Sequence, residues 1–308
     1  MGILAKAGTR DWETTFENWS QGPGKTEQEK CDRAQAAIRR AVEKSTKLGW
    51  RNVSAFPQGS YANRTNVRQD SDIDVCVLCR DAIVVDYPED ISDAETGLSG
   101  SGYRFAQYKD DLEAALVDHF GRRHVRRGNK AFDINENIYR VDADAAPCFR
   151  YRNYFRGSDG GVYFNEGTAL YPDNARFRRV INYPRQQYKN GVAKNERTAR
   201  RFKRMVRIVK KLRNEMDEAG VAAAGPVPSY LIECLVWNAP DDLFQGLTWR
   251  STVQGVLADL WQRTGNDAEC TEWTEENGIK YLFRTSQAWT RLEANDFLQA
   301  AWNYVENG

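Results

Sequence analysis

A glycine–serine pair followed by two closely spaced aspartates constrains this chain more than any other feature. Gly59-Ser60 is followed, after eleven residues, by Asp72-Ile73-Asp74 and then by the apolar run Val75–Cys79. Side chains two residues apart in a strand share a face, so Asp72 and Asp74 should project together from one edge of a sheet. Carboxylates this close favour a cation between them, and Mg²⁺ binds one or two carboxylates together with substrate phosphates. Since the Gly-Ser turn can direct N–H groups and a hydroxyl to a phosphate, the pattern predicts a nucleotidyltransferase metal site.

The composition is that of a globular protein without a strong charge bias. The chain has 308 residues, of which 41% are hydrophobic and 28% charged, and its formal net charge is +1. This length allows one large or two medium domains. The low net charge argues against a basic field for tight nucleic-acid binding. No apolar run reaches the roughly 18 residues of a membrane span, and no secretory signal pattern is present, so we expect a cytoplasmic protein without a membrane span.

The cysteines do not form a disulfide or zinc pattern. Their scattered spacing indicates buried thiols in a reducing compartment. Cys76 and Cys79 form a C-x-x-C, but within a strand residues three apart point to opposite faces, and no second ligand pair exists. Core packing is therefore the expected role of both. The chain has only two histidines, His119 and His124, so the sequence does not favour a histidine-based catalytic triad.

The hydrophobic pattern predicts an N-terminal α/β lobe and a C-terminal helical lobe with a cleft between them. We place the first lobe, with a long N-terminal spine helix, at residues 1–185 and the helical lobe at residues 186–308. In the first lobe we expect a helix from a capping box at Thr26–Glu29 to about Leu48, strands over Asn52–Phe56 and Asp72–Cys79, a mobile acidic excursion over 81–101, a helix over about Tyr103–Phe120, a basic strand over 122–127 and a strand over Ile138–Asp144. In the second we expect helices from Thr198 to Gly220 and over Ser229–Trp237, Thr252–Arg263 and Ala288–Val305.

Two-metal nucleotidyl transfer needs a third carboxylate. One ion is shared between the carboxylates and the triphosphate, and the other lowers the pKa of the attacking hydroxyl. A neighbouring strand supplies Asp142 and Asp144, and both have the right parity, so the pattern alone leaves the two open. The helix predicted from Thr198 carries many Arg and Lys around its apolar stripe. Most of these should form a solvated face, and one or two near the helix start could reach a polyphosphate.

Four blocks of sequence carry a family resemblance. The segment Gly59–Asp74 resembles the signature of the oligoadenylate synthetase and cyclic-GMP-AMP-synthase superfamily, and within it the bacterial CD-NTases (cGAS/DncV-like nucleotidyltransferases) of clade E. Three further blocks follow in the same order, at Val180–Asn195, Arg201–Arg207 and Pro228–Leu235. The resemblance implies an α/β (α+β) fold: a polymerase-beta-like nucleotidyltransferase lobe with a mixed sheet, an oligoadenylate-synthetase-like helical lobe, and the active site in the cleft between them.

The resemblance also implies roles for individual residues. The family's third carboxylate stands three residues before a Pro or an apolar residue, as Asp144 does before Pro147, so it implies Asp144 rather than Asp142. Asp72, Asp74 and Asp144 would then be the catalytic residues and would hold two Mg²⁺, with Mn²⁺ able to substitute. The remaining matched positions are implied to bind nucleotide: Gly59, Ser60 and Lys203 at the triphosphate, Ser229 and Tyr230 along the cleft, and Asn182 at the base.

Two of these positions have a structural alternative. An Asn at position 182 goes with uracil recognition in the resembling enzymes, because an amide offers both a donor and an acceptor to the uracil edge. Such a site rejects other bases, because with them the site's own polar groups would be left unpaired. The alternative is an Asn that caps a local turn. For Tyr230, the alternative to a cleft-lining aromatic is a buried structural tyrosine.

The function implied is synthesis of a cyclic oligonucleotide second messenger from nucleoside triphosphates with release of pyrophosphate. Asn182 favours a pyrimidine-containing cyclic dinucleotide, cyclic UMP-AMP or cyclic di-UMP, made from ATP and UTP, with GTP or CTP as further substrates. The product would activate an effector protein encoded nearby in antiphage (CBASS) defence. We expect a monomer that needs no nucleic-acid activator. Three alternatives stay open: a purine-only cyclic di- or trinucleotide synthase, a nucleotidyltransferase that modifies a protein, an RNA end or a small molecule, and a non-catalytic nucleotide-sensing module.

Overall fold

The chain forms two compact units. The computed structural model describes residues 10–67, 72–98, 102–135, 137, 140–174 and 179–307. A sheet unit contains Pro23–Ala62 and the described residues between 72 and Arg185. A helical unit contains the described residues up to Gly22, the segment Asn63–Val67, and the described residues from Gln186 on. Residues 68–71 of the signature segment, and Ile138 and Tyr139 of a predicted strand, lie outside the described residues.

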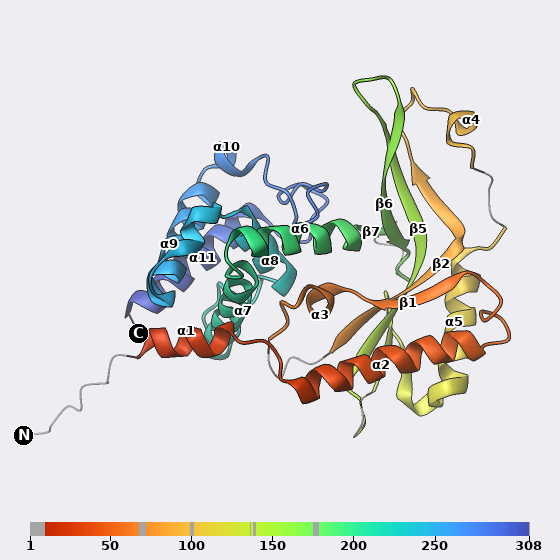
Figure 1. Cartoon of the computed structure of the whole chain (residues 1–308), viewed down its shortest axis with the longest axis horizontal. Coiled ribbons are helices and arrows are strands. Elements are labelled where there is room, and N and C mark those ends of the chain that lie inside the picture. The colour runs from red at the N-terminus through yellow and green to blue at the C-terminus, as the bar shows by residue number, and fades with distance from the viewer. Residues whose placement is uncertain are drawn as a thin grey trace, which may run out of the picture. The chain divides into compact units, whose positions relative to one another are not determined.

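The sheet unit is built on one mixed sheet (Figure 1). Its strand order is β1-β2-β5-β4-β3, and β6 and β7 continue the sheet from β5. The pair β2·β5 is parallel and the other pairs are antiparallel. The strands are β1 (Val53–Pro57), β2 (Ile73–Asp86), β3 (Val125–Arg127), β4 (Phe132–Ile134), β5 (Ala143–Arg156), β6 (Val162–Leu170) and β7 (Val180–Asn182). The predicted mixed sheet joined to a helical C-terminal part is confirmed.

Alternating residues of the central strands separate the core from the face that carries the aspartates. Ile73, Val75 and Val77 of β2 are fully buried in a core cluster shared with α2 (Lys25–Lys44) and α5 (Phe105–Phe120). Because side chains alternate along a strand, the intervening residues of β2 point to the opposite face. There Cys76 and Leu78 pack in a smaller apolar cluster. Asp74 lies two residues before Cys76 and therefore belongs to this second face.

Four predictions for the sheet unit need correction. The strand expected over Ile138–Asp144 is wrong in its bounds, because β5 begins only at Ala143 and continues to Arg156. The capping box at Thr26–Glu29 is wrong, because α2 begins at Lys25 after Gly24, which makes no side-chain cap. The excursion expected from residue 81 begins later, because β2 continues to Asp86 after a register shift between Cys79 and Ile83. The strand signal there is the β-branched run at 83–85, which the flanking acidic residues obscured. The basic strand is shorter than expected, since a 3₁₀ turn, η1 (Arg122–His124), precedes β3. The unit also contains α3 (Gly59–Asn63), whose last residue belongs to the helical unit, and α4 (Asp93–Thr96).

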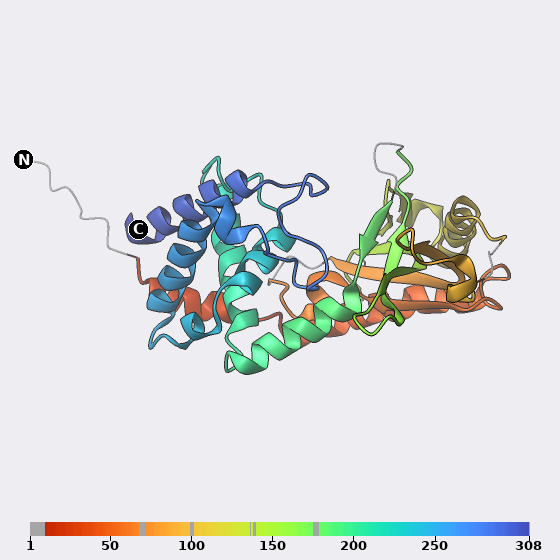
Figure 2. The same ribbon diagram turned by 90° about the horizontal axis from the view of Figure 1, so that it is seen from above.

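The helical unit packs its helices around one apolar core (Figure 1 and Figure 2). Phe202, Met205 and Val209 of α7 have no more than 1% exposure, and α8, α9 and α11 pack around them. The helices are α1 (Trp12–Ser20), α6 (Pro184–Arg197), α7 (Phe202–Glu218), α8 (Ser229–Asn238), α9 (Trp249–Thr264), α10 (Asp267–Cys270) and α11 (Arg291–Asn307), with a 3₁₀ turn, η2 (Asp241–Gln245).

The helix predictions in this unit are confirmed for α8, α9 and α11 within about three residues. The helix expected from Thr198 starts later, at Phe202, because Ala199 and Arg200 adopt positive φ and separate it from α6. The helix α6 was not predicted. It buries only Gly191 and Lys194, so it has no apolar stripe for a periodicity argument to detect.

Two further expectations can be compared with the structure. All six cysteines are buried free thiols, as expected. Among the helices of the described residues, none combines the length and the apolar character needed to cross a lipid bilayer.

Candidate active site

The Gly59-Ser60 turn lies directly beside Asp74. Strands β1 and β2 pair up to Pro57 and Val75, and the Gln58 N–H donates to the Asp74 carbonyl at 2.9 Å. Gly59 then adopts φ +64°, and a Cβ at this position would collide with Oδ2 of Asp74. Only glycine meets both conditions. The chain therefore uses glycine here to bring the start of α3, with Ser60, against a carboxylate.

Three aspartates from three neighbouring strands share one row of the sheet. Asp74 of β2 pairs in parallel register with Asp144 of β5, and Asp144 pairs in antiparallel register with Asp133 of β4. Directly paired residues of neighbouring strands project to the same face. Asp133 was not among the predicted site residues. The signal that could have found it is the alternation Phe132-Asp133-Ile134, in which one carboxylate lies between two buried apolar side chains.

This row concentrates negative charge around Asp144. Burial raises the pKa of Asp144 to about 6, and the charges of Asp133, Asp74 and Asp72 and a hydrogen bond with Asp133 add to the effect. Asp133 is itself ion-paired with Arg126, whose Nε lies 2.7 Å from Oδ2. A group with this environment favours a cation or a proton at neutral pH.

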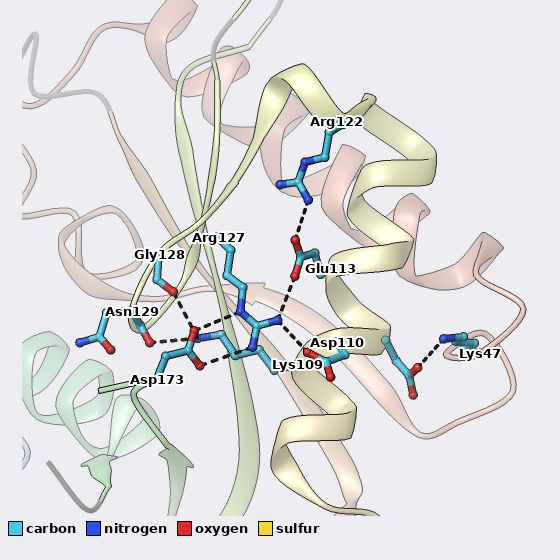
Figure 3. A network of polar contacts seen from close by, with 10 residues as sticks. Lys47, Lys109, Asp110, Glu113, Arg122, Arg127, Gly128, Asn129 and Asp173 are labelled. Atoms are coloured by element: carbon cyan, nitrogen blue, oxygen red, sulfur yellow. Dashed lines mark hydrogen bonds and ion pairs between the residues drawn. The ribbon is translucent and has the colours of Figure 1, made fainter. Parts of the chain in front are cut away.

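A network of ion pairs fixes the turn between β3, which carries Arg126, and β4, which carries Asp133 (Figure 3). Lys109 of α5 is 1% exposed, and its Nζ donates to the carbonyls of Gly128 at 3.2 Å and Asn129 at 2.9 Å. The same ammonium lies 3.0 Å from Asp173, which also contacts Arg127 of β3. These contacts anchor the β3–β4 hairpin to α5. They therefore also fix the position of Asp133 in the row of aspartates.

A cavity of about 320 Å³ adjoins the row of aspartates. Its lining consists of Asp72, Arg126, Asp133, Ile134, Asn135, Asp142, Ala143 and Asp144. Both candidates for the third carboxylate line this cavity. Asp142 is exposed and precedes β5, and its carbonyl accepts from the Ile73 N–H at 3.1 Å, whereas Asp144 lies within the strand and pairs in register with Asp74.

The donor set fits a hard divalent cation in its chemistry. In the part of the chain that the structure describes, no three His, Cys, Asp or Glu side chains have the arrangement of a formed metal site. The carboxylates of Asp74 and Asp144 nevertheless come from neighbouring strands, and carboxylate oxygens are the ligands that Mg²⁺ prefers. The raised pKa of Asp144 indicates negative charge that such a cation would neutralise.

Asn182 lies on the same face of the sheet as Asp144. It is the last residue of β7, is half-buried, and pairs with Thr168 of β6, which pairs with Arg150 of β5. Arg150 and Asp144 are six residues apart in β5, an even number, so their side chains share a face. Asn182 therefore ends a polar row, with Arg150 and Thr168, on the face that carries the aspartates.

The other predicted nucleotide-binding residues belong to the helical unit. Burial lowers the pKa of Lys203, an effect that the charges of Glu276 and Glu233 oppose, and its Nζ lies 5.6 Å from the centroid of the Tyr188 ring. Ser229 begins α8, and its Oγ accepts from Arg213 at 2.8 Å.

Tyr230, another predicted nucleotide-binding residue, makes contacts within the helical unit. Its hydroxyl donates to Glu275 at 2.9 Å, and its ring packs edge-on against Trp289. These contacts are those of the structural alternative, in which Tyr230 is held by the helical core.

Comparisons with known proteins cover nearly the whole chain. Residues 189–306 match the cGAS/DncV-like nucleotidyltransferase C-terminal helical domain. The chain is 41% identical to the cyclic dipyrimidine nucleotide synthase CdnE of Legionella pneumophila, over 96% of this chain and 98% of that protein. It is 36% identical to a cyclic dipurine nucleotide synthase of Elizabethkingia meningoseptica, over 94% and 96%. Its fold matches the structure of the Rhodothermus marinus CdnE c-UMP-AMP synthase with Apcpp and Upnpp at a TM-score of 0.82, with 30% identity and 96% of both chains covered.

Proposed function

Because this chain belongs to the cGAS/DncV-like nucleotidyltransferases (CD-NTases), we propose that it joins nucleoside triphosphates into a cyclic dinucleotide that contains at least one pyrimidine, with release of pyrophosphate. The family resemblance inferred from four sequence blocks is thereby confirmed. The observation that carries the proposed chemistry is the register of Asp74 and Asp144 on parallel strands, with the Gly59-Ser60 turn against Asp74. A chain that had kept only the fold would not need this arrangement.

Each residue of the site has a defined task in the proposed reaction. Asp72, Asp74 and Asp144 would hold two Mg²⁺, with Asp144 in its ionised form. When bound there, such ions would lower the pKa of the attacking ribose hydroxyl and neutralise charge on the α-phosphate. Ser60 and the start of α3 contact the triphosphate, with Lys203 as a further contact.

The pyrimidine preference rests on Asn182. Its amide offers a donor and an acceptor, which matches the edge of uracil. The Legionella pneumophila relative is named for dipyrimidine products and the Rhodothermus marinus relative for a product with UMP and AMP. The name of the Elizabethkingia meningoseptica relative favours purine-only products as the second candidate.

The test is incubation of the purified protein with radiolabelled nucleotide pairs and Mg²⁺, followed by nuclease mapping of the products. We expect UTP to enter a phosphatase-resistant product, alone or with ATP. Efficient all-purine product without use of UTP would assign the second candidate. Label appearing only on a protein, an RNA end or a small molecule would contradict cyclic dinucleotide synthesis.

We also propose that the product is a second messenger in antiphage (CBASS) defence and that the protein acts as a cytoplasmic monomer. The cellular role is supported by the family, whose products activate an effector encoded nearby. Infection of cells that carry the chain with its neighbouring genes, compared with an Asp74→Ala variant, tests this role. Equal phage yields from the two strains would contradict it.

A further inference from the structure

A buried polar cluster in the helical unit grips the segment Asn63–Val67. At its centre is Glu233 of α8, which is 2% exposed. Its Oε1 accepts from Asn63 Nδ2 at 3.1 Å and from Gln187 Nε2 at 3.0 Å. Its Oε2 accepts from the Thr65 hydroxyl at 2.6 Å and from Lys210 Nζ at 3.0 Å. One carboxylate therefore holds two residues of the segment and two residues of the helices around it.

The backbone of the segment is held as well. Lys210 Nζ also donates to the Thr65 carbonyl at 3.2 Å, and Arg207 Nη1 donates to the Arg64 carbonyl at 2.5 Å. Thr65 is 0% exposed and Asn63 is 3% exposed, so water does not compete for these bonds. A hydrogen bond to a charged group stabilises the folded protein more than a bond between two neutral groups does. Burying the charged group without its partner costs still more free energy.

The charge of Glu233 is sustained by its neighbours. Burial would raise the pKa of Glu233, but the Lys210 ammonium and the hydrogen bonds from Thr65 and Lys210 hold it below its ordinary value. Burial and the adjacent Glu233 charge raise the pKa of Glu276. Each oxygen of the Glu233 carboxylate thus accepts two hydrogen bonds.

The segment held by this anion continues the nucleotide-binding turn. Helix α3 runs without interruption from Gly59 to Asn63, so fixing Asn63 restrains the carboxyl end of the helix that begins with Gly59-Ser60. Asp72 follows seven residues after Thr65. The proposed mechanism uses both ends of this stretch but does not use Glu233, Lys210 or Thr65.

We propose that Glu233 is a positioning residue for nucleotide binding: by anchoring Asn63 and Thr65 it sets the place of Gly59 and Ser60 for the triphosphate. This inference rests on the proposed function. It predicts that loss of the anchor weakens nucleotide binding beyond what a loss of stability explains.

The sharpest test uses Thr65, because two small substitutions separate its hydroxyl from its packing. Thr65→Val removes the donor to Glu233 and keeps the shape, whereas Thr65→Ser keeps the donor. For Thr65→Val we expect KM for the nucleotide, and the Kd of a non-reactive triphosphate analogue measured by calorimetry, to rise about tenfold. We expect kcat to change by less than about threefold, as for a loss of ground-state binding. Thr65→Ser should restore both binding constants to near wild type.

The chain offers a matched control for the lysine of the cluster. Lys194 is as buried as Lys210, and its Nζ also pairs with a carboxylate, Asp241, and a carbonyl, that of Ala239, both at 2.7 Å. Neither partner belongs to the segment. Lys210→Met should raise the Kd of the analogue, and Lys194→Met should lower the melting temperature by a similar amount with the Kd unchanged.

The outcomes separate this inference from the proposed function. An unchanged Kd in Thr65→Val, or an equal rise in Thr65→Ser and Lys194→Met, overturns the positioning role. If the wild type binds the analogue but makes no cyclic product, the proposed function fails while the binding comparison still decides the role of Glu233. If Lys210→Met does not fold, the comparison of Thr65→Val with Thr65→Ser decides alone.

Discussion

The carboxylate of Asp74 occupies the space that a side chain at Gly59 would need. The two residues lie on neighbouring segments, β2 and the turn that follows β1, and Gly59 has φ +64°. The Gly59-Ser60 turn and the Asp74 carboxylate are therefore in close contact. A change at one of them must move the other.

Replacement of Gly59 by alanine should displace the Asp74 carboxylate and reduce kcat/KM by at least about 100-fold, because small displacements of reacting groups are costly. Steady-state synthesis of product from nucleotides measures this loss. The positive φ alone adds a strain of about 1 kcal/mol, which Ala bears at any such site.

Gly97→Ala is the matched control for that strain. Gly97 has φ +62° and nothing lies within 4 Å of the position of its added Cβ. It should lose stability to the same extent and keep its kcat/KM. Equal losses of activity in the two variants would contradict a specific contact between Gly59 and Asp74.

The third carboxylate is decided by comparing Asp144→Ala with Asp142→Ala. Only Asp144 lies in the strand and pairs in register with Asp74, whereas Asp142 is exposed ahead of it. We expect Asp144→Ala, like Asp72→Ala and Asp74→Ala, to abolish product formation, and Asp142→Ala to reduce it by less than about tenfold. Circular dichroism should show all four variants folded. The reverse ranking of the two variants would assign the third carboxylate to Asp142.

Metal binding can be tested without turnover through the stability of Asp144→Asn. The pKa of Asp144 is raised to about 6 from an ordinary value of 3.8, so the folded protein holds its proton more tightly than the unfolded chain. The contribution of Asp144 to the free energy of unfolding is therefore at its maximum below pH 3.8 and is lost as the pH rises through 6. At pH 7.5 and without divalent ions, Asn should stabilise the protein by about 2 kcal/mol, after allowance for solvent screening.

Added Mg²⁺ should reverse the order of the two proteins. An ion that binds only the folded state stabilises it, and the wild type has the fuller set of carboxylates. We therefore expect the melting temperature of the wild type to rise with Mg²⁺ and that of Asp144→Asn to stay nearly constant. Asp142→Asn serves as the control and should respond as the wild type does. A wild type that does not respond to Mg²⁺ would contradict a metal site at Asp144.

The sequence predicted the elements with strong periodicity and left out those defined by long-range pairing. The spacing of Asp72 and Asp74 before an apolar run placed them at the start of a central strand. Asp133 was missed because its alternation with Phe132 and Ile134 spans only three residues, and its place in the row comes from pairing with Asp144. A strand this short is specified by its neighbours and not by its own composition.

Glu276 was not predicted for the same reason, because its environment depends on residues distant in the sequence. It lies between α10 and α11 in a stretch that contains the isolated bridge between Thr274 and Tyr281, and local sequence there reads as polar loop. Its complete burial beside Glu233 depends on residues more than forty positions away. Local patterns carry no signal for a buried carboxyl pair, because ordinary acidic residues at such positions are exposed.

Replacement of Glu276 by glutamine should stabilise the protein increasingly as the pH rises. Burial and the charge of Glu233 raise the pKa of Glu276 above its ordinary value of 4.5. The folded state therefore holds this proton more tightly than the unfolded chain, and the wild type loses stability as the pH rises above 4.5. Glutamine is neutral throughout and can still donate to Glu233. Thermal unfolding at about pH 5 and pH 8 should show a gain for Glu276→Gln that is larger at pH 8 than at pH 5. The control is Glu272→Gln in the same stretch, where the side chain is 76% exposed and should leave the pH dependence unchanged. A gain that is the same at both pH values would show that Glu276 is ionised in the folded protein.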